Sequence, residues 1–250
     1  MTAAVERLRA HLHTTQLLGS IHSALYYDQN TAMPSGGSAW RGEQLALLAL
    51  QLHERQSSPA YAELLAEAEQ ELGPDAAAES QRNLHLLRQE LQRQQCLDGA
   101  LVRELAEAQA QGYALWQEAR SKADFQLFAP ALEHLIGLRR RQAEQLAPVE
   151  RDAAGNRRSP WEILAQPFEP DITKARLDAL FAPLRQRLPE LLEQARSIPT
   201  GSSENWDLPE AAQEELCDAL LKDWGFDPSR CARHRSPHPF SCTVGPSDFR

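Results

Sequence analysis

The stretch TKARLDALFAPLRQRLPELL, residues 173–192, decides the fold class of this chain. Its apolar side chains recur at steps of three and four, which places them on one face of an α-helix. Thr173 can cap the start of this helix, and Pro183 and Pro189 are expected to bend or divide it. The residues of the apolar face are Leu177, Leu180, Phe181, Leu184, Leu188, Leu191 and Leu192.

The same periodicity recurs along almost the whole chain. No segment shows the period-two alternation of β-branched residues that a half-buried strand needs. Ser159, Pro160 and Glu162 form a capping box with a proline at the first helical position, which predicts a helix of about two turns. The sequence therefore predicts an all-α protein. The other expected helices cover about residues 2–27, 38–55, 59–72, 75–96, 99–121, 125–147 and 208–224.

The breaks between these helices are short, except for residues 199–205, which resemble a linker. Because short connections favour antiparallel neighbours, we expect a single large domain over residues 1–250, mostly of antiparallel helices, helical through residue 224. Residues 225–250 carry four prolines and no amphipathic stripe. This segment is expected to be irregular and to need a partner against which to pack.

Composition and charge exclude several classes of protein. With 250 residues and 42% hydrophobic side chains, the chain can bury a sizeable core. Its net charge of -9 does not provide the basic face that a nucleic acid needs, so no nucleic-acid partner is expected. Residues 1–20 lack an apolar h-region, so we expect no signal peptide, and no run approaches the roughly 20 apolar residues of a membrane span. We expect a cytoplasmic protein whose four cysteines are reduced.

Four side chains of the types that bind zinc lie close together in the sequence, at Cys231, His234, His238 and Cys242. Their spacing matches no standard finger pattern, and prolines on both sides of His238 stiffen the chain. A reduced, proline-rich loop is therefore favoured over a zinc site, and we expect no metal ligands in this chain. The sequence also lacks an HExxH motif, a GxSxG elbow and a Gly-rich phosphate loop. No catalytic residue is predicted within it.

Asp28 is the carboxylate whose surroundings stand out. It lies in Tyr26-Tyr27-Asp28-Gln29, an aromatic and otherwise uncharged stretch just before a break at Pro34. A carboxylate in such surroundings is expected to be partly buried and hydrogen-bonded. A structural role near the helix end is favoured over a functional one.

Five groups of residues, in order along the chain, match the motifs of a known family. They are Tyr27 to Pro34 with Arg41 and Glu43 to Ala46; Trp116-x3-Arg120 with Asp124, Phe125, Phe128, Pro130 and Leu132; Trp161-Glu162-x-Leu164 with Phe168-Glu169-Pro170; Gly225-Phe226-Asp227; and His238-Pro239-Phe240-Ser241 with Asp248-x-Arg250. Together they resemble the M32 family of metallocarboxypeptidases, the thermostable carboxypeptidase Taq type. HPF followed by DxR at this spacing is the most specific part of the resemblance.

The resemblance covers the N-terminal half of the family's motifs. The HExxH zinc motif, its downstream glutamate ligand and the later arginine-bearing motifs have no counterpart in this sequence. Within the matched half, Tyr27, Trp161-Glu162 and His234 replace residues that are more usual in the family. The resemblance thus implies a truncated or split half of the enzyme. Zinc is expected for the full-length protein, and its ligands are absent from this chain.

What the resemblance implies is a zinc-dependent exopeptidase that removes single residues from peptide C-termini. The present half would build one wall of a deep helical cleft. His238 would donate a hydrogen bond to the substrate or to the developing oxyanion, and Phe240 would line the pocket. Arg250 would bind a carboxylate, directly or by holding the fold around Asp248. An alternative of equal weight is that His238-Pro239-Phe240 is a structural turn. The other residues assigned to the cleft as structural motif residues are Asp28, Gln29, Pro239 and Asp248.

Two classes of function remain open. In the first, the chain is half of a metallocarboxypeptidase and is inactive alone, because no complete zinc site can be built from it. Its partners would then be a peptide substrate, a C-terminal half that carries the zinc site and, as the family suggests, a second copy in a homodimer. In the second, the chain is a non-catalytic helical protein that binds peptides or a partner subunit.

Overall fold

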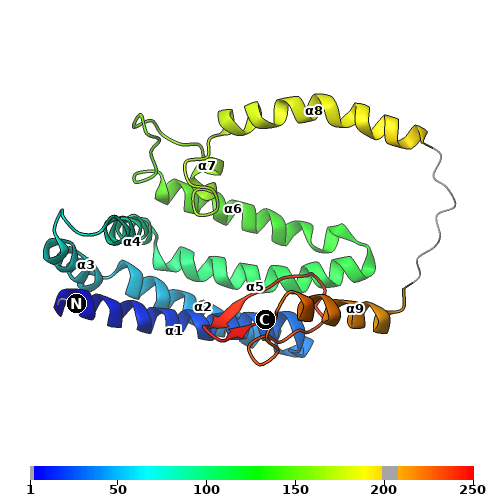
Figure 1. Cartoon of the computed structure of the whole chain (residues 1–250), viewed down its shortest axis with the longest axis horizontal. Helices are drawn as coiled ribbons and strands as arrows, with labels where there is room; N and C mark the ends of the chain where they lie inside the picture. Colours follow the sequence, from blue (N-terminus) through cyan, green and yellow to red (C-terminus); the bar gives the residue numbers. More distant parts are fainter. Residues whose placement is uncertain (1–2, 199–207) are drawn as a thin grey trace. The chain divides into compact units, whose positions relative to one another are not determined.

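The computed structural model of the chain describes residues 3–198 and 208–250. Within these ranges the structure consists of helices, loops and one small hairpin (Figure 1), which confirms the all-α prediction. The chain divides into two compact units. The first unit comprises Met1–Ile163 with Ala232–Arg250, and the second comprises Leu164–Cys231.

The helices follow the order that the periodicity predicts, with bounds that differ from the predicted ones by a few residues at most ends. The predicted linker at residues 199–205 lies outside the described residues. The elements of the first unit are α1 (Ala3–Thr31), η1 (Ser35–Gly37), α2 (Ser38–Ser57), α3 (Pro59–Leu72), α4 (Ala78–Cys96), α5 (Gly99–Lys122), η2 (Phe125–Leu127) and α6 (Ala129–Leu146). Helix α7 (Pro160–Ala165) spans the boundary between the units, and the second unit contains α8 (Lys174–Ser197) and α9 (Glu210–Asp223).

Helix α1 continues past its predicted end at residue 27. The side chains of Asn30 and Thr31 donate hydrogen bonds to the carbonyl oxygens of Tyr26 and Tyr27, over 2.7 and 2.8 Å. These bonds accompany the last turn of the helix, which ends shortly before Pro34. Helix α1 therefore includes the whole stretch Tyr26-Tyr27-Asp28-Gln29 that stood out in the sequence.

The helix predicted at residues 125–147 is divided in the structure into the 3₁₀ turn η2 and the α-helix α6. Asp124 caps η2 by accepting a hydrogen bond from the backbone N–H of Gln126, over 3.0 Å. Pro130 then occupies the first turn of α6, where its missing N–H has no cost. The tight turn allows α5 and α6 to run side by side in opposite directions (Figure 1).

Helix α8 is capped as predicted, because Thr173 Oγ1 accepts a hydrogen bond from the backbone N–H of Arg176, over 3.2 Å. Of the two effects expected of Pro183 and Pro189, bending or dividing the helix, division is wrong. The helix runs through both prolines for 24 residues, so its remaining hydrogen bonds outweigh those that the prolines remove. The capping box at α7 is confirmed: the backbone N–H of Ser159 donates to Glu162 Oε2 over 2.8 Å.

The core of the first unit contains two clusters of buried side chains. The first cluster joins α1, α3 and α4, and the second joins α5 and α6. A Cβ placed on Gly112 of α5 would lie 3.1 Å from Leu135 Cδ1 of α6, so the glycine permits the close approach of these two helices. The first cluster comprises Leu8, Tyr61, Leu65, Ala68 and Leu91, and the second comprises Leu101, Leu105, Ala108 and Leu138.

A small antiparallel hairpin, β1 (Thr243–Gly245) with β2 (Asp248–Phe249), ends the first unit. The sequence indicated no strand, because two or three residues are too few to show an alternating pattern. The rest of the segment at 225–250 contains no helix, as predicted. None of the helices that the structure describes is long and apolar enough to cross a membrane.

Candidate functional site

Residues 232–250, here called the C-terminal segment, pack against α1 and α5 of the same unit. In Figure 1 its hairpin, drawn in red, lies beside α1. On the α1 side, the hydroxyl of Tyr27 is hydrogen-bonded to Nδ1 of His234 over 2.5 Å. On the α5 side, Nη1 of Arg120 donates to the carbonyl oxygen of Pro237 over 2.6 Å. The segment is therefore attached at two points on two helices.

The His238-Pro239-Phe240 turn, which directly follows Pro237, is held by aromatic contacts to α1 and α5. The Phe240 ring lies 5.8 Å from the Tyr26 ring and 5.7 Å from the Tyr27 ring. The His238 ring lies 6.0 Å from the Trp116 ring, at 75° to it. Edge-to-face contacts of this kind are favourable beyond the apolar area that they bury. Three rings from α1 and α5 thus position the turn.

The side chains of the turn differ in their exposure to solvent. His238 and Pro239 are exposed, whereas Phe240 is half-buried. The Ser236 hydroxyl donates to the carbonyl oxygen of His238 over 2.7 Å, which supports the backbone of the turn. The imidazole of His238 is therefore accessible while its backbone is held. This arrangement is compatible with a substrate contact and with a structural turn, so both interpretations remain predictions.

Arg250 and Asp248 form a bidentate ion pair within the hairpin. Nη2 of Arg250 donates to Oδ2 of Asp248 over 2.9 Å, and Nε donates to Oδ1. This pairing lowers the pKa of the Asp248 carboxyl and raises the pKa of the Arg250 guanidinium. The guanidinium also lies 5.4 Å from the centre of the Tyr27 ring. In this structure the carboxylate that Arg250 binds is that of Asp248.

Burial raises the pKa of Tyr27, and the positive charge of Arg250 partly opposes this effect. The phenol therefore stays protonated at neutral pH and can donate its proton to His234 Nδ1. Because Tyr27 contacts His234, Phe240 and Arg250, this single side chain joins α1 to both ends of the C-terminal segment.

Asp28 lies apart from the turn and connects α1 to α2. Its Oδ2 accepts a hydrogen bond from Nη2 of Arg41 over 2.6 Å, and Nη1 of Arg41 donates to the carbonyl oxygen of Leu25 over 2.5 Å. The Arg41 side chain is 12% exposed and that of Asp28 is 46% exposed. The carboxylate is thus hydrogen-bonded and partly buried, as its neighbourhood suggested, with Arg41 as the more buried partner.

Gln29 faces α5 rather than the C-terminal segment. The residue is 8% exposed, and its Nε2 donates to the carbonyl oxygen of Ala110 over 3.4 Å. Its Oε1 is buried and has no hydrogen-bond partner among residues 3–198 and 208–250. Of the residues assigned to the cleft from the sequence, His238, Pro239, Phe240, Asp248 and Arg250 lie in the C-terminal segment, where Phe240 and Arg250 both contact Tyr27.

The described residues do not fit a zinc site. A catalytic zinc needs three protein ligands that converge on one point. Within residues 3–198 and 208–250, no group of three histidine, cysteine, aspartate or glutamate side chains could hold a metal ion. Nδ1 of His234 is instead engaged by the Tyr27 hydroxyl. The structure therefore does not assemble Cys231, His234, His238 and Cys242 as a ligand set.

Trp116 and Arg120 matched a motif in the sequence, but no role in the site was predicted for them. They lie four residues apart on α5, with the guanidinium 5.4 Å from the centre of the indole, and both contact the C-terminal segment. An aromatic residue followed by arginine at this spacing shares one helix face. That spacing is the signal by which sequence analysis could have found them.

The sequence matches the family model described as "Carboxypeptidase Taq (M32) metallopeptidase" over residues 7–250. The chain belongs to the M32 family. This membership confirms the resemblance that the motifs indicated. The solved structure described as "BsuCP Crystal Structure" has the same M32 fold as this chain, with a TM-score of 0.90 at 25% sequence identity. The match covers 100% of this chain and 49% of that one.

Curated M32 relatives show the same relation in length. Thermostable carboxypeptidase 1 of Thermus thermophilus is 29% identical over 255 residues, which covers 99% of this chain and 50% of the relative. Carboxypeptidase 1 of Bacillus subtilis is 27% identical over 229 residues, which covers 90% of this chain and 44% of the relative. The chain therefore spans about half the length of the curated relatives that it matches.

Proposed function

We propose that this chain acts as the N-terminal half of a metal-dependent carboxypeptidase that releases C-terminal amino acids from peptides. The observation that carries the proposal is the family match over residues 7–250, together with an exposed His238 on a turn held by α1 and α5. The backbone of His238 is held in place while its imidazole is exposed to solvent, so the imidazole can contact a substrate.

In this proposal the residues of the chain bind and orient the peptide. His238 donates a hydrogen bond to the substrate carbonyl, and Phe240 lines the adjoining surface. Arg250 acts through its ion pair with Asp248, which holds the hairpin that follows the turn. Zinc, the metal expected from the family resemblance, would be bound by residues of a C-terminal half, since its ligands are expected to be absent from this chain. The chain alone is therefore expected to be inactive.

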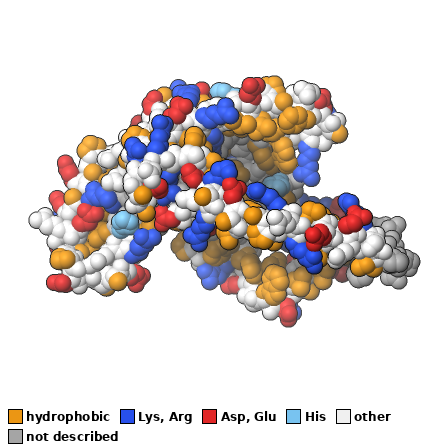
Figure 2. Space-filling view, turned by 90° about the horizontal axis from the view of Figure 1, so that it is seen from above, with side chains coloured by type: hydrophobic (Ala, Val, Ile, Leu, Met, Phe, Trp, Pro, Cys, Tyr) orange, Lys and Arg blue, Asp and Glu red, His pale blue; other side chains and the backbone are white. Residues whose placement is uncertain are grey.

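The proposal also assigns partners. The apolar face of α8 is exposed along its length, and Figure 2 shows hydrophobic side chains at the surface among charged side chains of both signs. Exposed apolar side chains of this extent are typical of surfaces that contact another protein. We assign this face to the C-terminal half of the enzyme or to a second copy in a homodimer, within the cytoplasm.

A complementation assay tests the proposal. The 250-residue chain is purified alone and is also co-expressed with the remaining half of a relative, such as Carboxypeptidase 1 of Bacillus subtilis. Release of the C-terminal residue from an N-blocked dipeptide is then measured with added zinc. We expect release by the assembled pair and none by the chain alone. Release by the chain alone would contradict the proposed division of the enzyme.

The role of His238 is tested in the same assembly. His238→Gln is expected to lower kcat/KM by about 100-fold or more, since loss of one oxyanion donor has effects of this order. His134→Gln, a matched change on an exposed position of α6, should leave kcat/KM unchanged. Equal activity of the two variants would assign the HPF turn a structural role.

A second function, that of a non-catalytic peptide- or partner-binding protein, is the alternative, and the exposed apolar face of α8 is compatible with it. If the chain associates with the complementary half or with peptides but the assembly never hydrolyses the dipeptide, this second function becomes the better one.

A further inference from the structure

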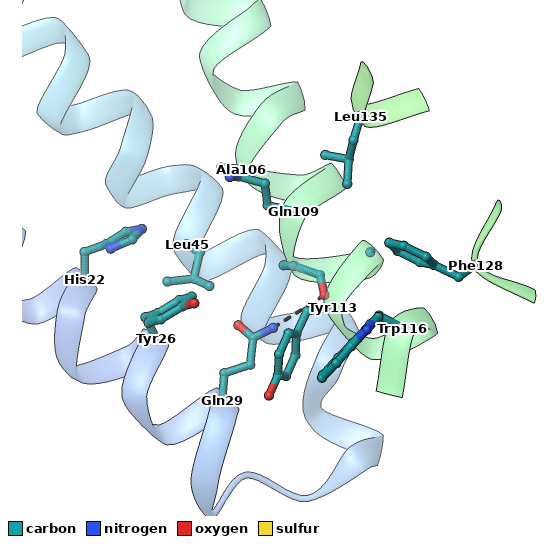
Figure 3. Close-up of a pocket in the computed structure, with 12 residues that line it drawn as sticks. His22, Tyr26, Gln29, Leu45, Ala106, Gln109, Tyr113, Trp116, Phe128 and Leu135 are labelled. Atoms are coloured by element: carbon teal, nitrogen blue, oxygen red, sulfur yellow. Dashed lines mark hydrogen bonds between the residues drawn. The ribbon is translucent and has the colours of Figure 1, made fainter. Parts of the chain in front are cut away.

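A pocket of about 420 Å³ lies in the first unit and opens to solvent. Side chains of α1, α2, α5 and α6 line it, together with Phe128 at the turn between α5 and α6 (Figure 3). Its volume is within the range of pockets that bind small molecules, so it can admit one amino-acid side chain.

Two rings of the pocket wall also contact the His238-Pro239-Phe240 turn. Trp116 and Tyr26 both line the pocket (Figure 3). The Trp116 ring lies 6.0 Å from the His238 ring, and the Tyr26 ring lies 5.8 Å from the Phe240 ring. The pocket therefore adjoins the turn that would contact the peptide in the proposed function.

The lining of the pocket carries no formal charge. Among the described residues, none of those that line it is an aspartate, glutamate, lysine or arginine. Burial lowers the pKa of His22, which favours its neutral form at neutral pH. Arg120 contacts the Trp116 ring but is not a lining residue, and it donates to the carbonyl oxygen of Pro237 over 2.6 Å. A charged side chain in the pocket would lose hydration without a counter-charge, so an uncharged one is favoured.

Most of the wall surface is apolar. Phe128 and Leu135 contribute an aromatic ring and an aliphatic side chain (Figure 3). Oε1 of Gln29 and the hydroxyl oxygen of Tyr113 are themselves buried, so neither atom is presented to the pocket. Contact with such a wall removes apolar surface of a ligand from water, which is favourable in proportion to the area removed.

We propose that this pocket binds the side chain of the penultimate residue of the peptide, and that this side chain is large and apolar. The inference rests on the proposed function, in which His238 donates a hydrogen bond to the substrate carbonyl. The carbonyl of the bond that a carboxypeptidase cleaves belongs to the penultimate residue. The side chain of that residue therefore starts one bond away from the carbonyl carbon, nearest to the turn. Peptides with leucine or phenylalanine before the released residue are the preferred substrates.

Dipeptides with an acetyl blocking group test this preference in the complemented assembly, because an acetyl group is too small to fill the pocket. We expect acetyl-Leu-Ala and acetyl-Phe-Ala to have a kcat/KM about tenfold or more above that of acetyl-Ala-Ala, since apolar pockets discriminate by this order. Acetyl-Glu-Ala should be the poorest substrate. Equal values for leucine and alanine at the penultimate position would overturn the inference. So would a preference confined to the C-terminal residue, measured with acetyl-Ala-Leu.

A variant that fills the pocket tests its location. Ala106→Phe places a ring in the pocket from α5 and should remove the preference for leucine and phenylalanine, with acetyl-Ala-Ala hydrolysed as before. Ala100→Phe is the same change at an exposed position of α5 outside the pocket, and it should retain the preference. An undiminished preference in Ala106→Phe would overturn the inference.

A charge at the pocket keeps the test decisive if Ala106→Phe does not fold. Gln109 is an exposed lining residue of α5. Gln109→Arg should raise kcat/KM for acetyl-Glu-Ala by about threefold to fivefold, and added salt should reduce this gain. Gln111→Arg, at an exposed position of α5 outside the pocket, should produce no gain. No gain in Gln109→Arg, or an equal gain in Gln111→Arg, would contradict the assignment of the pocket.

The same measurements separate this inference from the proposed function. If the assembly hydrolyses acetyl-Ala-Ala but shows no preference at the penultimate position, the inference is overturned and the proposed function stands. If the assembly hydrolyses none of the dipeptides, both are overturned.

Discussion

Helices α3 and α8 are both amphipathic, yet their apolar faces have different surroundings. In α3 the residues Tyr61, Leu65 and Ala68 are buried, and Leu65 is 0% exposed. In α8 no residue is buried, and Leu192 near its end is 57% exposed. A helical pattern of apolar residues therefore specifies which face needs a partner, but it does not specify whether the partner lies in the same unit.

The difference has an energetic meaning. Each leucine that is fully buried stabilises the fold by about 2 kcal/mol relative to an exposed one. The first unit obtains this stabilisation from contacts among its own helices, whereas the apolar face of α8 is left to a partner in our proposal. Variants in the two regions should therefore respond very differently.

The largest contrast is expected for leucine-to-alanine changes. Leu65→Ala should lower the free energy of unfolding by about 2–5 kcal/mol, because it leaves a cavity in the first core cluster. Leu188→Ala on α8 should change it by less than about 0.5 kcal/mol, since that side chain is exposed. Urea unfolding followed by circular dichroism measures both. Similar losses in the two variants, with a Tm that rises with protein concentration, would show that a second copy covers α8.

Arginine-to-methionine changes sharpen the same comparison for ion pairs. Arg41 makes hydrogen bonds to Asp28, Leu25 and Gln44 from a largely buried position. Arg41→Met should cost about 2–3 kcal/mol, because bonds that involve charged groups are the stronger ones. Arg187 on α8 pairs with Glu190 at an exposed position.

Arg187→Met serves as the matched control in this second experiment. Exposed pairs of this type contribute about 0.5 kcal/mol or less. Urea midpoints of the two variants provide the measurement. A loss in Arg187→Met as large as that in Arg41→Met would indicate that α8 is packed in solution.

A smaller effect is expected where the C-terminal segment meets α1. Tyr27→Phe removes the hydrogen bond to His234 and should destabilise the segment by about 1 kcal/mol. The amide protons of Cys242 and Arg250, which are bonded across the hairpin, should then exchange about fivefold faster. Tyr26→Phe is the control, as no hydrogen bond of this kind is lost there. Unchanged exchange in Tyr27→Phe would mean that the aromatic contacts alone hold the segment.

The change in the free energy of unfolding with pH should be smaller than the effects of these substitutions. Burial lowers the pKa of His22, and burial followed by the charge of Arg55 lowers that of His11. Between these lowered values and the usual value of about 6.5, the unfolded chain binds more protons than the folded one. Stability should therefore fall as the pH drops below about 6.5. The lowered pKa of Asp248 acts only in more acidic solution, near and below the usual value of about 4.

Urea midpoints between pH 8 and pH 5 measure this dependence. His22→Gln should flatten the decline below pH 6.5, whereas His134→Gln on the exposed face of α6 should leave it unchanged. A decline of the same steepness in both variants would assign the effect to groups other than His22.

Local chemistry explains why most of the fold could be predicted. The apolar periodicity, the Ser159 capping box and the Thr173 cap depend on residues within one or two turns of each other, and the structure confirms each of them. The expectation that Pro183 and Pro189 bend or divide α8 was wrong for division, because the remaining hydrogen bonds of a 24-residue helix outweigh those that the two prolines remove. The hairpin at Thr243–Gly245 was missed because its strands are too short to carry a pattern.

The sequence by itself determined the helices, the family and the HPF and DxR motifs, because these depend on local spacing and residue type. Only the tertiary structure showed that Trp116 and Arg120 of α5 hold the turn, and that Gln29 of α1 donates a hydrogen bond to the carbonyl oxygen of Ala110. The physical reason is that these facts depend on distances between residues far apart in the chain. Gln29 and Ala110 lie on different helices, and only packing brings the two together.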